Sequence, residues 1–303
     1  MFSELLNESG LSLDRLESFC LVAQAGGVTK AARGDPAKQS LFSRQIKELQ
    51  EFFGAELIRR KGRGIALTEA GARLHIIARD SFASLSDFKN DCKGRPVEVV
   101  IGTGESIIHW LLMPRLDDLR KRLPNVRLKF LNLPTTEAVK RLADGMIDFA
   151  LVRADAVKRP LQATPLGDLT YALFVPASLR ATTGQKSGLK ALDGIPLATL
   201  EGEGSFRNEL AMIAKKAGQQ LNIQVECSSF PLVARAVAKG NVAAILPSIA
   251  AGDLKDAGVE VVTVPFLKHF ERAMCLASNT RLIRIRPVLQ RVAVVLAQAC
   301  RLS

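Results

Sequence analysis

Cysteine is scarce in this 303-residue chain, and the few that occur are scattered. They are Cys20, Cys92, Cys227, Cys275 and Cys300, with no CxxC pair and no histidine at ligand spacing. Zinc fingers and disulfide scaffolds need clustered or paired cysteines. The sequence therefore excludes both and suits a reducing compartment.

Long apolar runs are also missing. A membrane-spanning helix needs roughly 18 consecutive apolar residues. The longest candidate here, residues 292–300, is too short and includes Gln298. The first ten residues show neither the basic start nor the apolar core of a secretory signal. We therefore expect a cytoplasmic protein with no membrane partner.

Catalytic constellations are absent as well. The three histidines, His75, His109 and His269, form no triad-like pattern with a serine or cysteine. Glycine-rich loops at 102–106 and 202–205 resemble the dinucleotide-binding GxGxxG pattern. In both, another residue replaces the third glycine. The sequence predicts no enzyme, no cofactor and no metal site.

The charge of the chain is strongly positive. It has 42 Lys and Arg against 30 Asp and Glu, a net charge of +12, with 48% apolar residues. The length suffices for two or three domains with real cores. An excess of basic residues favours anionic partners such as nucleic acid. Residues 28–63 alone carry nine basic side chains against four acidic ones.

The first part of the chain has helical periodicity. Apolar residues at 16, 19, 20 and 23 predict a helix that Gly26-Gly27 ends. A short segment, 28–33, precedes a helix that Asp35 caps and that runs to Phe53. Two short strands, 57–60 and 65–67, flank a glycine-containing turn. Residues 13–67 thus predict a winged helix-turn-helix behind an N-terminal extension, residues 1–12.

A long helix is predicted at 68–94, with Thr68 as its cap. One stripe runs along it, formed by Leu74, Ile77, Ala78, Phe82, Leu85 and Phe88. Such a stripe is either core or a dimer seam, and a helix-turn-helix that reads two half-sites favours the seam. Glycine and proline at 94 and 96 predict a domain boundary.

From residue 97 the pattern changes to strands alternating with helices. This predicts an α/β domain at 95–303 with a parallel-dominated sheet, whose ligands bind at the carboxyl ends of its strands. We expect this domain to consist of two lobes, with the chain crossing between them near 152–165 and 267–272.

Ordered motifs resemble the LysR-type transcriptional regulators. They are GVTKAA at 27–32, SRQIKEL at 43–49, GAEL at 54–57, LTEAG at 67–71 and GNVAAILP at 240–247. The resemblance implies a linker helix that pairs two chains, assembly as a dimer or tetramer, and a two-lobed effector domain resembling type II periplasmic binding proteins. Lobe 1 would comprise about 95–160 and 268–303, and lobe 2 about 161–267. Departures from the family pattern occur at Asp35, Lys38, Ser40, Gln50 and Ile58.

Side chains on the second helix can read DNA. Gln39 can pair with adenine, and Arg44 with guanine or a phosphate, while wing cations can enter the minor groove. Taken singly, each could equally be a solvated surface residue. The predicted DNA-contacting residues are Thr29, Lys38, Gln39, Ser40, Ser43, Arg44, Lys47, Lys61 and Arg63.

A second predicted site binds the effector. Ser106 and Thr135 stand at helix starts, where N–H groups bind anions, and Arg153 can pair with a carboxylate. In the resemblance these three line the cleft between the lobes. Further candidates are Thr103, Ser205, Phe206 and Phe230. The hydroxyls could instead be helix caps, and Arg153 could pair with Asp155 or Asp148. The excess of basic residues is compatible with an anionic effector, and solvated arginines would explain it as well.

The sequence therefore predicts a regulator that binds promoter DNA under the control of a small molecule, with RNA polymerase as a candidate partner. The alternative is a small-molecule-binding protein or enzyme of the same two-lobed fold with an accessory DNA-binding domain. A third possibility is a nucleoid-type protein that binds DNA without sequence preference.

Overall fold

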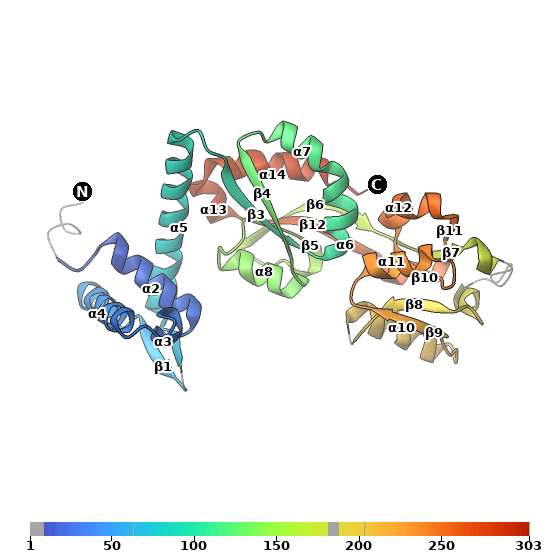
Figure 1. Ribbon diagram of the computed structural model, residues 1–303, viewed down its shortest axis with the longest axis horizontal. Coiled ribbons are helices and arrows are strands. Elements are labelled where there is room, and N and C mark those ends of the chain that lie inside the picture. The colour runs from blue at the N-terminus through green and yellow to red at the C-terminus, as the bar shows by residue number, and fades with distance from the viewer. Residues whose placement is uncertain (1–8, 63, 181–187, 203, 303) are drawn as a thin grey trace. The chain divides into compact units, whose positions relative to one another are not determined.

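The computed structural model describes residues 9–62, 64–180, 188–202 and 204–302 (Figure 1). The chain divides into two compact units, Met1–Arg95 and Pro96–Ser303. The division falls at the glycine and proline expected to separate two domains. Each unit is described by itself.

The described part of the first unit contains, in chain order, α2 (Leu13–Ala25), α3 (Val28–Ala31) and α4 (Pro36–Phe53). Gly26 ends α2 in the left-handed conformation. At the start of α4, the Asp35 carboxylate accepts hydrogen bonds from the backbone N–H groups of residues 37 and 38, at 2.9 and 3.3 Å. The first N–H groups of a helix have no partner within it, so this carboxylate caps α4 as predicted. The shared core includes Phe19, Val22, Ile46 and Leu49.

The wing consists of two antiparallel strands, β1 (Ile58–Lys61) and β2 (Gly64–Leu67). The N–H of Ile65 donates to the Gly26 carbonyl at 3.0 Å, which joins the wing to the turn after α2. On the other side, the Gln50 side-chain oxygen accepts from the N–H groups of Leu57 and Ile58, at 2.9 and 3.4 Å. Gln50, one of the departures from the family pattern, therefore holds the start of the wing against α4.

The helix α5 (Glu69–Cys92) follows the wing, and the Thr68 hydroxyl caps it by accepting from the Gly71 N–H at 3.0 Å. The predicted apolar stripe divides into two parts. Leu74 and Ala78 are buried, whereas Ile77, Leu85 and Phe88 are 60%, 51% and 68% exposed. The stripe therefore serves the core of this unit near its start and leaves apolar side chains on the surface farther along.

The first lobe of the second unit contains a five-stranded sheet in the order β4-β3-β5-β12-β6. Its strands are β3 (Val97–Thr103), β4 (Val126–Asn132), β5 (Phe149–Arg153), β6 (Leu161–Leu169) and β12 (Arg272–Asn279). The first three are parallel, and β12 is antiparallel to both of its neighbours. One face packs on α7 (Leu116–Arg122) and α14 (Pro287–Ala299), and the other on α8 (Thr135–Ala143) (Figure 1).

The second lobe is built from short strands. An antiparallel sheet, β10-β7-β11, contains β7 (Tyr171–Pro176), β10 (Ala244–Pro247) and β11 (Val259–Val262), and β8 (Leu197–Leu200) pairs in parallel with β9 (Ile223–Cys227). The prediction of a parallel-dominated sheet is wrong here. Short apolar runs show that a strand is buried but not which way it runs.

The remaining helices are short. They are α6 (Glu105–Ile107), α10 (Ser205–Lys216), α11 (Phe230–Ala238), α12 (Ala251–Leu254) and α13 (Thr280–Ile285). Segment η1 (Ile108–Leu112) is a π-helical turn. Short 3₁₀ segments are η2 (Met113–Arg115), η3 (Ala154–Ala156), η4 (Ala177–Leu179), η5 (Gly188–Leu192), η6 (Ser248–Ala250), η7 (Lys255–Ala257) and η8 (Pro265–Phe270).

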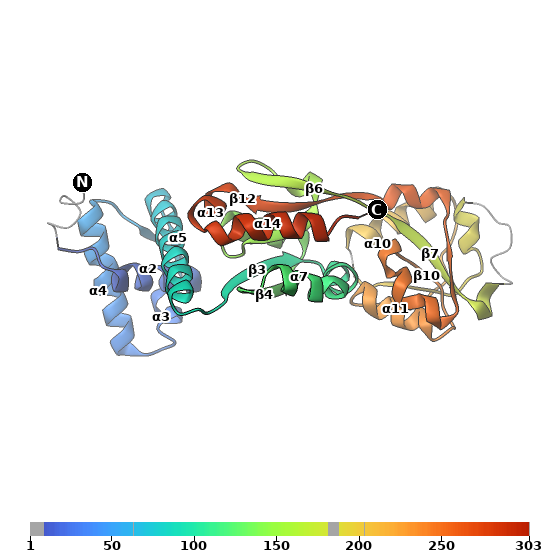
Figure 2. The same cartoon turned by 90° about the horizontal axis from the view of Figure 1, so that it is seen from above.

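The chain passes between the lobes at two places. Strand β6 pairs with β12 over its whole length, so the first crossing lies at Thr170 between β6 and β7 (Figure 2). The expected crossing at 152–165, and with it the start of lobe 2 at residue 161, is wrong. The cause is the irregular pairing of β6 with β12, because the register slips between Met274 and Cys275 and breaks the strand periodicity of β6. The second crossing follows Phe270, where η8 ends.

Candidate functional site

The solvent-facing side of α4 carries most of the predicted DNA-contacting residues. Those that are exposed are Lys38, Ser40, Ser43, Arg44 and Lys47, and Gln39 is half-buried. Thr29 on α3 donates its hydroxyl hydrogen to the Gln39 side-chain oxygen at 3.5 Å, so the structure brings these two together. Lys61 is exposed at the end of β1. Arg63 lies outside the described residues.

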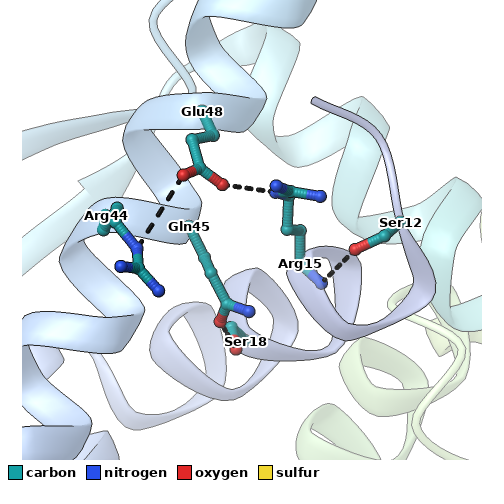
Figure 3. A network of polar contacts seen from close by, with 6 residues as sticks. All are labelled: Ser12, Arg15, Ser18, Arg44, Gln45 and Glu48. Carbon is teal, nitrogen blue, oxygen red and sulfur yellow. Dashed lines mark hydrogen bonds and ion pairs between the residues drawn. The ribbon is translucent and has the colours of Figure 1, made fainter. Parts of the chain in front are cut away.

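A polar network that the sequence analysis missed orients one of these cations. The Glu48 carboxylate accepts a hydrogen bond from Arg15 on α2 and pairs with Arg44 at 3.8 Å (Figure 3). Beside it, the Ser18 hydroxyl donates to the Gln45 side-chain oxygen at 2.5 Å. The network links α2 to α4. It holds the Nε of Arg44 near Glu48 and leaves the Arg44 side chain 70% exposed. The four-residue spacing of Arg44 and Glu48 was the available signal.

The second candidate site is a cavity of about 430 Å³ at the place where the lobes meet. Its lining residues are Arg153, Asp155, Glu209, Glu271, Arg272 and Ala273. The Nε of Arg153 lies 3.5 Å from an Asp155 carboxylate oxygen. Arg272 pairs with Glu209 of α10 and donates to the carbonyls of His269 and Glu271, at 2.7 and 2.9 Å. Of the predicted effector residues, only Arg153 lines this cavity.

Four aromatic rings gather at the edge of the second lobe. Tyr171 stacks on Phe206 with ring centres 5.5 Å apart, and Phe206 lies 5.1 Å from Phe230 and 5.0 Å from Phe270. Burial raises the pKa of the Tyr171 hydroxyl to about 12, although Arg272 and Arg153 act in the opposite direction. The influence of these two arginines, which both line the charged cavity, indicates that the aromatic cluster lies near it.

The predicted hydroxyl residues do not gather at this cavity. Thr103 is fully buried, and its hydroxyl donates to the Leu151 carbonyl at 2.6 Å. Its hydroxyl proton is therefore used within the sheet, and Thr103 does not line this cavity. Ser106, Thr135 and Ser205 lie at the starts of α6, α8 and α10.

A separate contact joins the lobes through the only tryptophan of the chain. Trp110 follows β3 of the first lobe but is buried in the core of the second, with Val233 and Val237 of α11. Its indole N–H donates to the Asp253 carboxylate at 3.0 Å, and the His109 ring nitrogen lies 3.0 Å from the same oxygen. The lobes are therefore linked by side chains as well as by the two crossings.

Two family models match these two units. The model for bacterial regulatory helix-turn-helix proteins of the lysR family matches residues 13–72, and that for the LysR substrate binding domain matches residues 94–300. The chain belongs to the LysR family. The resemblance seen in the sequence is confirmed, and the protein is a DNA-binding transcriptional regulator with an effector-binding domain rather than an enzyme.

Relatives of known name or structure agree with the family. A probable nitrogen assimilation transcriptional activator from Synechococcus elongatus is 27% identical over 253 residues, 81% of each chain. A full-length single-residue variant of OxyR from Pseudomonas aeruginosa has a TM-score of 0.66 at 19% identity, with 97% of this chain and 96% of that one covered. Full-length CbnR complexed with its target DNA has a TM-score of 0.57 at 20% identity, with 95% and 100% covered. These two structures share the fold of this LysR-family chain.

Four of the five cysteines of this LysR-family protein are less suited to redox chemistry than a free cysteine. Burial raises the pKa values of the Cys20, Cys275 and Cys300 thiols to about 11 and also raises that of Cys227. The thiolate is the reactive form, so burial makes these four thiols less reactive than a free cysteine near neutral pH.

Neither a membrane span nor a metal cluster occurs among the described residues. No described helix of this LysR-family chain is long and apolar enough to cross a membrane. Within the same residues, histidine, cysteine and carboxylate side chains form no cluster of three that could hold a metal ion.

Proposed function

We propose that this regulator reads its operator with the exposed face of α4 in the major groove and the wing at the adjoining minor groove. The observation that carries the proposal is the division of α4 into two faces. Phe42, Ile46 and Leu49 are buried, while Lys38, Arg44 and Lys47 project into solvent. Cations reach phosphates and guanine, and Gln39 reaches adenine. Thr29, Ser40, Ser43, Lys61 and Arg63 complete the proposed contact set.

The protein acts as a homodimer in this proposal, with a tetramer as a further assembly of dimers. A helix-turn-helix reads a palindromic operator as two half-sites, which requires two copies. The exposed apolar side chains of α5, namely Ile77, Leu85 and Phe88, suit a second copy of the same helix. Promoter DNA places the protein in the cytoplasm, and RNA polymerase is the partner through which bound protein would alter transcription.

The charged cavity binds the effector in this proposal. Arg153 comes from the first lobe, Glu209 from the second, and Arg272 from the strand that connects them. A small molecule that contacts all three would favour one arrangement of the lobes and so shift the population of DNA-binding states. Ser106, Thr135, Ser205, Phe206 and Phe230 remain candidate effector contacts in this proposal, although none of them lines the cavity.

Replacing Arg44 by alanine tests the DNA interface. Loss of a base contact should weaken operator binding by about 1–3 kcal/mol, with a smaller effect on scrambled DNA. Fluorescence anisotropy at fixed salt measures both, using DNA from the promoter beside the protein's own gene. Arg180→Ala is the matched control, because Arg180 is an exposed arginine paired with Glu260 in the other unit. Unchanged operator affinity in the Arg44 variant would remove this residue from the interface. Equal losses on both DNAs would make it a phosphate contact.

A charge placed on the apolar surface of α5 tests the dimer. Phe88→Glu should convert dimers to monomers, because Phe88 is 68% exposed and a buried carboxylate without a partner is strongly disfavoured at an interface. Light scattering coupled to size-exclusion chromatography gives the mass. Lys89→Glu, one residue along the helix and also exposed, is the control. A Phe88→Glu protein with unchanged mass would place the dimer interface elsewhere.

A further inference from the structure

Five of the six residues that line the cavity between the lobes are charged. Arg153 and Arg272 contribute two positive charges, whereas Asp155, Glu209 and Glu271 contribute three negative ones, so the lining has a net charge of −1. The domain as a whole is strongly basic, with 28 basic and 18 acidic residues in 94–303. The lining of the cavity therefore has the opposite sign to the net charge of the domain.

The two arginines are not equally available to a ligand. Arg272 is held by Glu209 and by two backbone carbonyls, and its side chain is 24% exposed. Arg153 is bound only loosely, by a 3.5 Å contact with Asp155, which is itself 72% exposed. An exposed pair of this kind contributes little free energy, so a ligand carboxylate can displace it. Arg153 is thus the arginine that can bind an anionic group.

The carboxylates provide the complementary position. Glu271 makes no ion pair in the part of the chain that the structure describes, and it is exposed at the cavity. Glu209 uses one carboxylate oxygen for Arg272 and keeps the other available. A ligand with anionic groups alone would meet these two carboxylates as well as Asp155, and like charges at short range disfavour binding. A cationic group would pair with them instead.

We propose that the effector is dipolar, with a carboxylate that binds Arg153 and an ammonium that binds Glu271 and Glu209. The inference rests on the proposed function of this cavity as the effector site, and it differs from the anionic effector with which the basic excess was compatible. The two ligand ends would contact opposite lobes, because Arg153 ends β5 while Glu209 lies on α10. A molecule with only one of the charges would engage one side and could not favour a single lobe arrangement. A volume of about 430 Å³ suits a small metabolite.

A series of four-carbon compounds isolates the charge. Succinate, 4-aminobutyrate and putrescine have similar lengths and carry two negative charges, one of each sign, and two positive charges. Calorimetric titration of the full chain at fixed ionic strength should give the highest affinity for 4-aminobutyrate. The six-carbon series of adipate, 6-aminohexanoate and hexanediamine tests spacing in the same way. Tightest binding by the dicarboxylate or the diamine in both series, or no binding by any member at millimolar concentration, overturns the proposal.

Single substitutions assign the two ends. Glu271→Gln should weaken binding of the amino acid by about tenfold, because the carboxylate that binds the ammonium is removed. The affinity for the dicarboxylate should then come closer to that for the amino acid. Arg153→Gln should weaken binding of the amino acid but not binding of the diamine. Glu260→Gln, a surface carboxylate paired with Arg180, is the control. Unchanged charge preference in the Glu271 and Arg153 variants contradicts the assignment.

DNA binding by the same preparations separates this inference from the proposed function. Normal operator binding together with an anion-selective cavity overturns only the dipolar effector. A protein that prefers the dipolar ligand but binds operator and scrambled DNA with equal affinity would support the ligand class. The same result would overturn the operator proposal.

Discussion

Replacing Gly71 by alanine should destabilise the DNA-binding unit by about 3 kcal/mol and abolish operator binding. A methyl group at this position would lie 1.9 Å from the carbonyl oxygen of Leu57, far inside van der Waals contact. The backbone on both sides of this contact belongs to regular structure, since Gly71 lies in the first turn of α5 and Leu57 immediately precedes β1. The Leu57 carbonyl also accepts from the Thr68 N–H at 3.1 Å. Relief of the clash must therefore separate the wing from α5.

Differential scanning calorimetry measures this effect. The transition of residues 1–95 should shift to lower temperature while that of residues 96–303 stays in place. Gly27→Ala is the matched control within the same unit, because Gly27 has extended backbone and a methyl group there meets nothing within 4 Å. A Gly71→Ala protein with both transitions unchanged would show that α5 and the wing do not approach as closely as the structure has them.

The capping residues of the DNA-binding unit could be predicted because their partners are near in sequence. Asp35 binds the N–H groups two and three residues ahead, and Thr68 binds that of Gly71. Such contacts depend only on residue type and spacing. The close approach of Gly71 to Leu57 was not predictable from periodicity, because it depends on how a strand and a helix meet.

The cavity illustrates the opposite case. Arg153 was found because it follows a predicted strand, but its neighbours were missed. Glu209 and Arg272 are 63 residues apart, and they meet only because the start of β12 and α10 of the second lobe come together at this cavity. Neither residue follows a strand or begins a helix, so spacing alone gave no signal. The basic excess of the domain was compatible with an anionic effector, but the composition of the domain does not describe the lining of this cavity, whose net charge is −1.

The assignment of β6 failed for a related reason. Its buried positions are 161, 166 and 169, which fit neither a strand period of two nor a helical period. Gly167 and the register slip opposite it account for the irregular spacing. Long-range pairing with β12 decides the location of this strand, and that pairing involves residues more than 100 positions away.

Loss of Arg286 should destabilise the effector-binding unit by about 3–5 kcal/mol. Arg286 lies between α13 and α14 and pairs with Asp148 just before β5, with both side chains less than a tenth exposed. It also donates to the Glu98 carbonyl at 3.1 Å, and the Asp148 carboxylate accepts from the Val100 N–H at 2.7 Å. Arg286→Met would remove the Arg286 guanidinium from beside a buried carboxylate. Removal of one partner from a buried pair costs much more than replacement of both.

Urea unfolding monitored by tryptophan fluorescence can measure this loss. Trp110 is the only tryptophan and is buried in the core of the second lobe, whereas Arg286 and Asp148 lie in the first. Because Trp110 and Asp253 join the lobes, we expect the two lobes to unfold together, so the fluorescence midpoint should fall in Arg286→Met.

The exposed neighbour variant Arg284→Met should keep the wild-type midpoint. The double variant Arg286→Met/Asp148→Leu should recover part of the loss, since it removes the stranded charge. A lower midpoint by circular dichroism without a change in fluorescence would instead mean that the lobes unfold separately, and that the Trp110 contact does not couple them.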